Sequence, residues 1–361
     1  MVGEARRANN FDLLRLVLAS MVVLDHCVSC SREPSLAWLR YIGGPGGFGG
    51  LGTIAVQGFF AISGYLVVAS YERSRSNRYY FLKRARRILP AYWGALIFVL
   101  LLGAGLSTLK VVAFLESPDT WKFAAANIAF ANFLHPSLPG LFTHNPKDNF
   151  VNGPLWTIKV EVMFYLFVPF LAAAGRRFGK WRILAPLFIL SLIFRAGFLH
   201  FHLARIANQL PGQLSFFLVG TFVHYYHEWF VRNRAWMWLA AGLSGAAIMV
   251  LRWPALQPAG VPLAFMCIAV LVPHIASPTR FGDLSYGIYV LHYPVVQSLV
   301  FLGVFHAWPM PAVGITAVTV GLLAFVSWNL VEARFLKGGA HRLPGEIGWD
   351  SRAEESVRLM R

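Results

Sequence analysis

The chain has 361 residues, of which 57% are hydrophobic and only 13% are charged. Apolar runs of about 20 residues, separated by short polar segments, make up most of its length. This pattern excludes a soluble domain, and it excludes a membrane β-barrel because barrel strands need alternating polar and apolar residues. The net charge of +16 does not indicate nucleic-acid binding, because the basic residues gather in particular loops.

Ten runs are long enough to cross a bilayer as helices, which predicts an all-α polytopic membrane protein with about ten transmembrane helices. They are residues 11–30, 51–71, 88–106, 155–174, 183–199, 210–229, 235–251, 259–276, 284–305 and 312–334. The short apolar run 121–134 predicts one re-entrant or interfacial helix. Because charged residues interrupt the first run and no clean cleavage site follows it, we interpret it as a helix and not as a secretory signal.

The distribution of basic residues predicts the orientation of these helices. With both termini in the cytoplasm, 22 of the 32 Lys and Arg residues lie on the cytoplasmic side and seven on the other side. Positive charge is enriched on the cytoplasmic side of membrane proteins. We therefore expect a multi-pass protein of the inner (plasma) membrane, with a transmembrane domain at residues 1–337 and a cytoplasmic tail at 338–361.

The first expected helix carries two ionisable side chains on one face. Arg15 and His26 are eleven residues apart, about three turns, with a rise of roughly 16 Å. Charges inside a span are costly and therefore suggest function. This layout suits a long donor such as coenzyme A, with its phosphates near Arg15 and its reactive group near His26. The imidazole would then serve as a general base or as a transient acyl carrier.

A structural interpretation of the same residues stays open. Asp12 and Arg15 are spaced to form an i,i+3 ion pair, and His26 would then only pack against a polar neighbour. The residues alone do not decide between the two interpretations.

A second cluster lies before the third run. Arg84 and Arg87 are neighbours on one helix face, a spacing that can grip phosphate oxygens. Orientation of the chain and binding of anionic lipid head groups would also explain such a basic segment.

Two further segments carry polar residues within apolar runs. Glu161 must be paired or face water, so it supports a histidine or pairs with Lys159 or Arg195. His292, in the segment 285–294, reads without further context as a structural, hydrogen-bonded histidine. Cys27 and Cys30 form a single C-x-x-C motif, and the chain has no second cysteine pair, so we expect no metal site.

Taken together, these residues resemble the acyltransferase-3 family of integral membrane O-acyltransferases from about residue 10 to residue 335. The most specific segment is FDLLR at 11–15, followed after ten residues by His26. Further segments that resemble the family are RARR at 84–87, GFFAISGY at 58–65, PLW at 154–156, VE at 160–161 and SY at 285–286 with YVLH at 289–292.

The resemblance implies transfer of an acyl group, commonly acetyl from acetyl-CoA, to a hydroxyl of a carbohydrate or glycolipid acceptor, in contact with membrane lipids and without nucleic acid. It implies the following roles: His26 and Glu161 as catalytic residues; Arg15, Arg84 and Arg87 as donor-binding residues; Asp12, Trp156, Tyr286 and His292 as acceptor-binding residues. The chain departs from the family pattern at Lys159, Val162 and 333–335, which bears on the acceptor pocket.

Two other functions fit buried charges in a membrane protein. A secondary transporter would show two related halves with paired broken helices, and the sequence shows neither. A scaffold that has lost catalysis would not need to keep Arg15, His26, Arg84 and Arg87 together.

Overall fold

The computed structural model describes residues 9–43, 50–251, 257–276, 278 and 282–337. Within these ranges the chain forms helices and no strands. The elements are α2 (Phe11–Ser31), η1 (Pro34–Gly43), α3 (Leu51–Glu72), α4 (Asn77–Leu106), α5 (Val111–Glu116), α6 (Pro118–Ile128), α7 (Leu155–Phe178), α8 (Lys180–His200), α9 (Ala204–Ala207), α10 (Leu210–Tyr225), α11 (His227–Arg232), α12 (Arg234–Leu251), α13 (Gln257–Leu271), α14 (Leu284–Phe301), α15 (Val304–Ala307), α16 (Pro309–Ser327), η4 (Trp328–Glu332) and α17 (Ala333–Lys337). The predicted tail at 338–361 lies outside the described residues.

Six helical segments of the described chain are long and apolar enough to cross a membrane: Phe11–Ser31, Leu51–Glu72, Asn77–Leu106, Leu155–Phe178, Lys180–His200 and Pro309–Leu336. The other four expected spans correspond to α10, α12, α13 and α14, which are shorter or more polar, so about ten spans are not confirmed. In α14 the reason is visible in the sequence, because the helix buries Ser285, His292 and Gln297 together with three tyrosines. The protein is a helical membrane protein.

The short apolar run expected at 121–134 forms α6, which starts earlier and ends at Ile128. It is only 11 residues long, too short to span a bilayer. The helix ends there because the chain turns at Phe130, whose φ of 58° is in the left-handed region.

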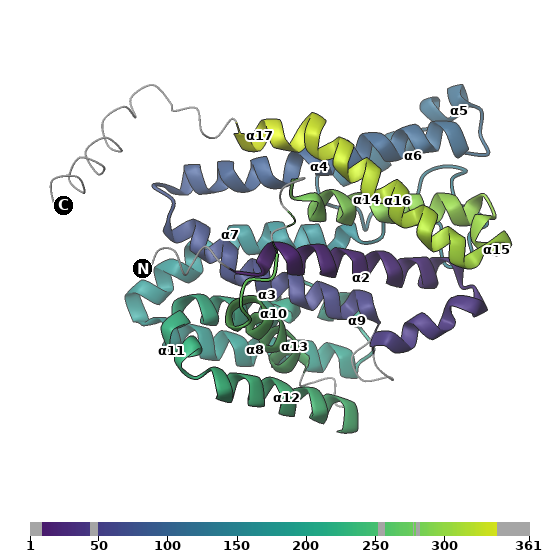
Figure 1. The fold of residues 1–361 in the computed structure, drawn as a ribbon. Coiled ribbons are helices and arrows are strands. Elements are labelled where there is room, and N and C mark those ends of the chain that lie inside the picture. The colour runs from purple at the N-terminus through teal and green to yellow at the C-terminus, as the bar shows by residue number, and fades with distance from the viewer. Residues whose placement is uncertain (1–8, 44–49, 252–256, 277, 279–281, 338–361) are drawn as a thin grey trace.

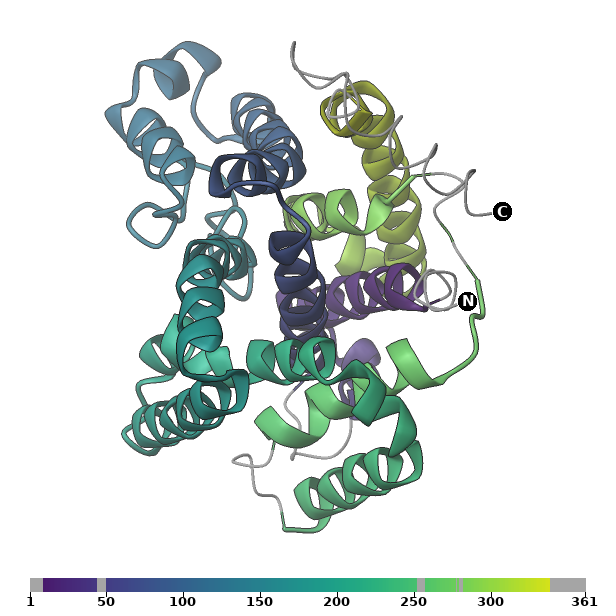
Figure 2. The same ribbon diagram turned by 90° about the vertical axis from the view of Figure 1, so that its left-hand side faces the viewer.

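The first two helices lie inside the bundle. In Figure 1, α2 and α3 run through the middle of the molecule, with α4 and α17 on one side and α8, α12 and α13 on the other, and Figure 2 shows the same arrangement at right angles. α2 packs on α3 and α14, and α3 packs on α10. Most side chains on these two helices are therefore buried or half-buried, with Val17, Ser20 and Thr53 among the exposed ones.

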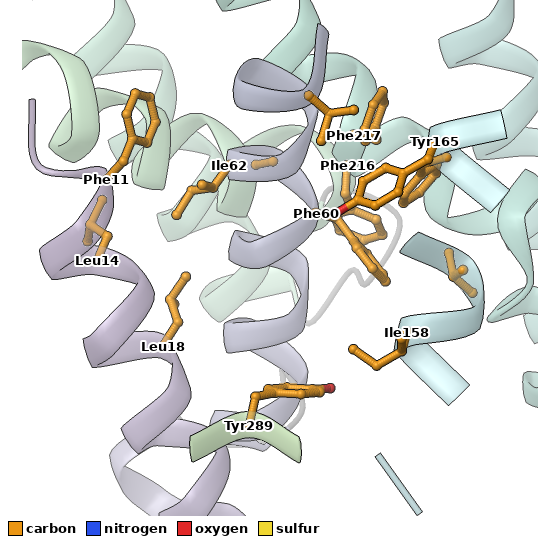
Figure 3. Close-up of a cluster of buried hydrophobic side chains, with 14 of the residues drawn as sticks. Phe11, Leu14, Leu18, Phe60, Ile62, Ile158, Tyr165, Phe216, Phe217 and Tyr289 are labelled. Carbon is orange, nitrogen blue, oxygen red and sulfur yellow. The ribbon is translucent and has the colours of Figure 1, made fainter. Parts of the chain in front are cut away.

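The packing of α3 on α10 depends on two glycines. A Cβ at Gly64 would collide with the carbonyl oxygen of Phe217, and one at Gly220 would collide with that of Ala61. Small residues at such positions let membrane helices approach closely. Around this contact, aromatic side chains fill the core: the rings of Phe164 and Phe217 stack at 4.4 Å. Figure 3 shows Phe60, Phe217 and Leu18 within this cluster.

The start of α2 is held by a side chain. The Asn10 amide nitrogen donates to the carbonyl oxygens of Val272 and Pro273 at 3.1 and 3.2 Å, and its oxygen accepts from the Ile275 N–H at 2.8 Å. Asn10 therefore satisfies backbone groups just after α13 that the helix leaves unpaired. This fixes where α2, and with it Arg15, begins.

The structure changes the expected position of the basic cluster. The third span was expected to begin at residue 88, but α4 begins at Asn77, where the Ser76 hydroxyl caps it by accepting from the Tyr79 N–H at 3.2 Å. Arg84 and Arg87 therefore lie on a continuous helix and not in a loop. Their guanidinium groups are held on one face of α4.

Candidate functional site

A cavity of about 100 Å³, which we call the arginine cavity, lies between α2, α3, α4, α7 and α14. Its charged lining residues are Arg15, Arg84, Arg87 and Glu161. The three arginines predicted to bind the donor come from two helices that are about 70 residues apart in sequence, and the fold brings them to one cavity.

Asp283 joins two of these arginines. Its Oδ2 accepts hydrogen bonds from Arg15 Nη1 and Arg87 Nη2, both at 2.5 Å, and its Oδ1 accepts from the Ser285 hydroxyl at 2.6 Å. Burial alone would raise the pKa of the Asp283 carboxyl, but Arg15 and Arg87 more than offset this and hold the pKa well below its usual range. Asp283 is therefore a permanent counter-ion for both arginines.

The sequence analysis did not identify Asp283. It expected Arg15 to pair with Asp12 or to face a ligand, but the observed partner is 268 residues away in sequence. The available signal was weak: a single acid two residues before the segment 285–294, next to the first residue of the helix that carries His292.

Arg84 differs from the other two arginines. In the part of the chain that the structure describes, it has no carboxylate partner: its Nη2 donates to the Ser70 hydroxyl at 3.3 Å, and its guanidinium lies 5.6 Å from the centre of the Tyr165 ring. Its Nε is buried without a hydrogen-bond partner. Arg84 is thus the cation that the arginine cavity leaves available for an anionic ligand.

Glu161 lies in the arginine cavity, where it accepts a 2.5 Å hydrogen bond from the Tyr165 hydroxyl. It pairs with neither of the cations considered above, because Lys159 donates to Gln209 at 2.7 Å and Arg195 donates to Asn208 at 3.4 Å. No hydrogen bond joins Glu161 to a histidine within the described residues. Its predicted catalytic role therefore stays a prediction.

A second cavity of about 360 Å³, which we call the histidine cavity, adjoins the first. Its ionisable lining residues are Asp25, His26, Lys147, Asp148, Arg195, Tyr289 and Tyr293. Trp156, predicted to contact the acceptor, also lines it. Val56 and Tyr289 line both cavities and so form part of the wall between them. The volume is in the range of small-molecule binding sites.

His26 and His292 form a hydrogen-bonded pair at the edge of the histidine cavity. His292 is fully buried behind His26, and its Nε2 lies 3.1 Å from His26 Nδ1. His292 Nδ1 lies 2.7 Å from the carbonyl oxygen of Tyr289, and His26 Nδ1 lies 2.9 Å from that of Val22. His292 Nδ1 also lies 3.2 Å from the carbonyl oxygen of Ile288, so the partners of the two Nδ1 atoms are main-chain carbonyl oxygens and, for His26, the His292 ring.

These contacts determine the tautomers of the neutral rings. A carbonyl oxygen only accepts, so His292 Nδ1 carries a proton, and its Nε2 is then an acceptor. His26 Nδ1 must consequently be the donor, shared between His292 Nε2 and the Val22 carbonyl oxygen. The remaining ring nitrogen, His26 Nε2, keeps its lone pair, and it has no hydrogen bond to any described residue. The pair therefore makes Nε2 the basic nitrogen of His26, a residue that lines the cavity.

Two other predicted acceptor-binding residues lie away from the histidine cavity. Tyr286 lines the arginine cavity and donates its hydroxyl to the carbonyl oxygen of Ile88 at 3.2 Å. Asp12 lines a separate small hollow with Asp283 and Ser285. In the described chain, no group of three His, Cys, Asp or Glu side chains is arranged to hold a metal ion.

Residues 9–328, nearly the whole chain, match the family described as an acyltransferase domain. The chain belongs to the acyltransferase-3 family. It is 31% identical to an O-acetyl transferase of Shigella phage Sf6, over 93% of this chain and 98% of that protein. It is 29% identical to Nodulation protein 10 of Rhizobium leguminosarum bv. viciae, over 91% and 93% of the two chains.

A third relative is the exopolysaccharide production protein ExoZ of Rhizobium meliloti (strain 1021), with 27% identity over 81% of this chain and 92% of that protein. No solved structure matches the chain. As a member of the acyltransferase-3 family, the protein is an acyltransferase that moves groups other than amino-acyl groups. An enzyme is therefore favoured over the secondary transporter and the inactive scaffold.

The role of Asp283 in this acyltransferase-3 protein leads to a stability prediction. Asp283→Asn leaves two arginines without their counter-ion and should destabilise the protein by about 2 kcal/mol, the usual size for hydrogen bonds to charged groups. Thermal unfolding of detergent-purified protein measures this as a fall in Tm. The control is Asp119→Asn, which removes an exposed pair with Lys122 and should leave Tm unchanged. Equal Tm values for the two variants would contradict the role of Asp283.

Proposed function

We propose that this protein transfers an acetyl group from acetyl-CoA to a hydroxyl of a glycan, with His26 Nε2 as the general base. The observation that carries the proposal is the His26–His292 pair, which leaves one basic nitrogen on the wall of a cavity that adjoins the arginine cavity. One ligand would enter each cavity, and the acetyl group would cross the wall at Val56 and Tyr289.

The positive charge of the arginine cavity supports binding of the anionic end of the donor there. Its three cations could attract phosphate groups, and Arg84, which has no carboxylate partner among the described residues, would donate charge-assisted hydrogen bonds to them. Arg15 and Arg87 would act mainly through their charge, because Asp283 already accepts from both. Acetyl-CoA supplies a thioester, which is an activated acyl group.

The proposed reaction needs one base and one acid in sequence. His26 Nε2 takes the proton from the acceptor hydroxyl as its oxygen attacks the thioester carbon. When the tetrahedral intermediate collapses, the carbon–sulfur bond breaks, and the sulfur leaves with the proton that Nε2 carries. His292 stabilises the ring of His26 in the required tautomer, so it acts as a positioning residue.

The names of the relatives support a hydroxyl of a glycan as the acceptor. One relative is named as an O-acetyl transferase and another as a protein of exopolysaccharide production. The expected cytoplasmic position of the basic segment 73–87 supports entry of the donor from the cytoplasm, since most of this segment forms the start of α4 and supplies Arg84 and Arg87 to the arginine cavity. The acceptor would then reach the histidine cavity from the other side.

The first test concerns His26. His26→Ala removes the base and should reduce acetyl transfer by about 10² to 10⁴-fold, while the protein still inserts in membranes. Labelled acetyl transfer from acetyl-CoA to glycan, per amount of inserted protein, measures this. His306→Ala is the matched control, since the His306 ring is exposed and lies far in sequence from the segment 11–26 that carries His26. Near-normal transfer by His26→Ala would remove His26 from the mechanism.

The second test concerns His292. His292→Leu removes the acceptor for His26 Nδ1–H and should lower kcat on the order of tenfold or more, with the KM for acetyl-CoA unchanged. His292→Gln can place a carbonyl oxygen near the former Nε2 and should recover part of kcat. A merely structural histidine would give similar kcat values for the two variants, whereas a donor-binding residue would change KM.

The third test concerns the donor. Arg84→Gln should raise the KM for acetyl-CoA about tenfold, because a charge-assisted phosphate contact is worth about 1.5 to 3 kcal/mol. Arg86→Gln makes the same change of charge on the same helix but outside the cavity lining, and it should leave KM unchanged. If both variants raise KM equally, the cluster acts only through general charge.

A further inference from the structure

One wall of the histidine cavity carries a buried cation. Arg195, on α8, is only 9% exposed and lines this cavity. In the part of the chain that the structure describes, its only hydrogen bond goes from Nη1 to the Asn208 amide oxygen at 3.4 Å, and its guanidinium lies 5.2 Å from the centre of the Phe216 ring. Its Nε is buried without a hydrogen-bond partner.

This arrangement is expensive unless a ligand completes it. An arginine inside a membrane helix bundle is normally paired with a carboxylate or with several carbonyl groups. Arg15 and Arg87 follow that rule through Asp283, but no carboxylate of the described chain lies within ion-pair distance of Arg195. A long hydrogen bond and one aromatic face leave most of the five guanidinium N–H donors unused.

The carboxylates of the same cavity do not serve as partners for Arg195. Asp148 accepts from the Tyr293 hydroxyl at 3.0 Å and also from Gln297. The carboxylate of Asp25 packs against Gly52, so closely that a Cβ added at Gly52 would collide with the carboxylate. Gly52 lies in the first turn of α3, and the N-terminus of a helix favours negative charge, so Asp25 is stabilised there. The other cation of the cavity, Lys147, donates to the Ser29 hydroxyl at 3.2 Å.

Two unpaired acceptors accompany the unpaired cation. The amide oxygens of Gln57 and Gln213 are buried without a hydrogen-bond partner, and both residues line the histidine cavity. Their amide nitrogens are already used, because Gln213 donates to Asn208 and Gln57 donates to Gln257. Hydroxyl groups can donate to these oxygens, whereas an anion suits Arg195. A ligand with both kinds of group would satisfy all three.

We propose that Arg195 binds an anionic group, a carboxylate or a phosphate, carried by the acceptor glycan close to the hydroxyl that is acylated. This inference rests on the proposed function, since it takes the histidine cavity as the acceptor site. A carboxylate would come from an acidic sugar such as a uronic acid, and a phosphate from a phosphorylated sugar or from a lipid diphosphate carrier. Gln57 and Gln213 would accept hydrogen bonds from sugar hydroxyls.

The transfer experiment compares four probes in membranes: methyl glucuronide, its methyl ester, methyl glucoside and methyl glucoside 6-phosphate. The wild-type protein should use the glucuronide or the phosphate with a kcat/KM about tenfold or more above the neutral probes. Arg195→Gln should abolish this preference but retain transfer to the neutral probes, and Arg195→Lys should retain part of the preference. Which anionic probe is preferred distinguishes the carboxylate from the phosphate.

The matched control is Arg205→Gln, an exposed arginine outside the cavity lining, which should keep the preference. A wild-type protein that uses neutral and anionic probes equally would overturn the inference. So would an Arg195→Gln variant that loses transfer to all probes in the same proportion.

Binding is measured separately by thermal unfolding in detergent, so that the inference does not depend on catalysis. The preferred anionic probe should raise the Tm of the wild-type protein and of His26→Ala, but not that of Arg195→Gln. Without a probe, Arg195→Gln should be at least as stable as the wild type, since it removes a buried charge that lacks a counter-ion. If the His26→Ala variant still transfers acetyl groups, the proposed role of His26 is contradicted. The anion site is still supported in that case, provided that the probe raises the Tm of the wild type but not that of Arg195→Gln. The anion site is contradicted if Arg195→Gln has a lower Tm than the wild type and the anionic probe does not raise the Tm of the wild type.

Discussion

The carboxylate of Asp283 holds Arg15 of α2 and Arg87 of α4 at the start of α14, and both arginines line the arginine cavity. Eleven residues beyond Arg15 on α2 and nine beyond Asp283, α2 and α14 meet again at His26 and His292. Two polar contacts therefore fix the same pair of helices at two levels. A shift of one residue along either helix would turn the imidazoles away from each other, because each residue rotates a helix by about 100°.

The low polarity of the interior is the reason why these contacts determine which ring nitrogens carry protons. A polar group without a partner is costly there, so each ring nitrogen that meets a carbonyl oxygen must donate. This is why the helix carbonyls of Val22 and Tyr289 can determine which nitrogen of His26 is basic. In the proposed reaction the catalytic geometry is thus set by main-chain atoms of α2 and α14, which move little as long as the helices stay packed. α3 packs on α2, and the close packing of α3 on α10 through Gly64 and Gly220 further restricts the movement of these helices.

Sequence reasoning found the parts of the site that local patterns reveal. The eleven-residue spacing placed Arg15 and His26 on one face of α2, and the three-residue spacing did the same for Arg84 and Arg87 on α4. It missed Asp283, and with it the sharing of one counter-ion by two arginines, because long-range pairing leaves no periodic signal. For His292 the sequence suggested a structural, hydrogen-bonded ring and the resemblance implied contact with a substrate; the ring is fully buried and hydrogen-bonded to His26, and the substrate contact stays a prediction. The number of spans could not be settled, since helices buried by their neighbours need not be as long or as apolar as lipid-facing ones.

The arginines of the two cavities fall into two kinds, and the difference bears on the reaction. Arg15 and Arg87 share Asp283 as their counter-ion, whereas Arg84 and Arg195, one in each cavity, have no carboxylate partner within the described chain. In the proposed reaction each of the latter would hold an anionic part of one substrate, the donor in the arginine cavity and the acceptor in the histidine cavity. Each bound anion would give a guanidinium the counter-ion that the described chain does not supply. Substrate binding would therefore offset the cost of a buried cation without a counter-ion, which favours binding of anionic substrates over neutral ones.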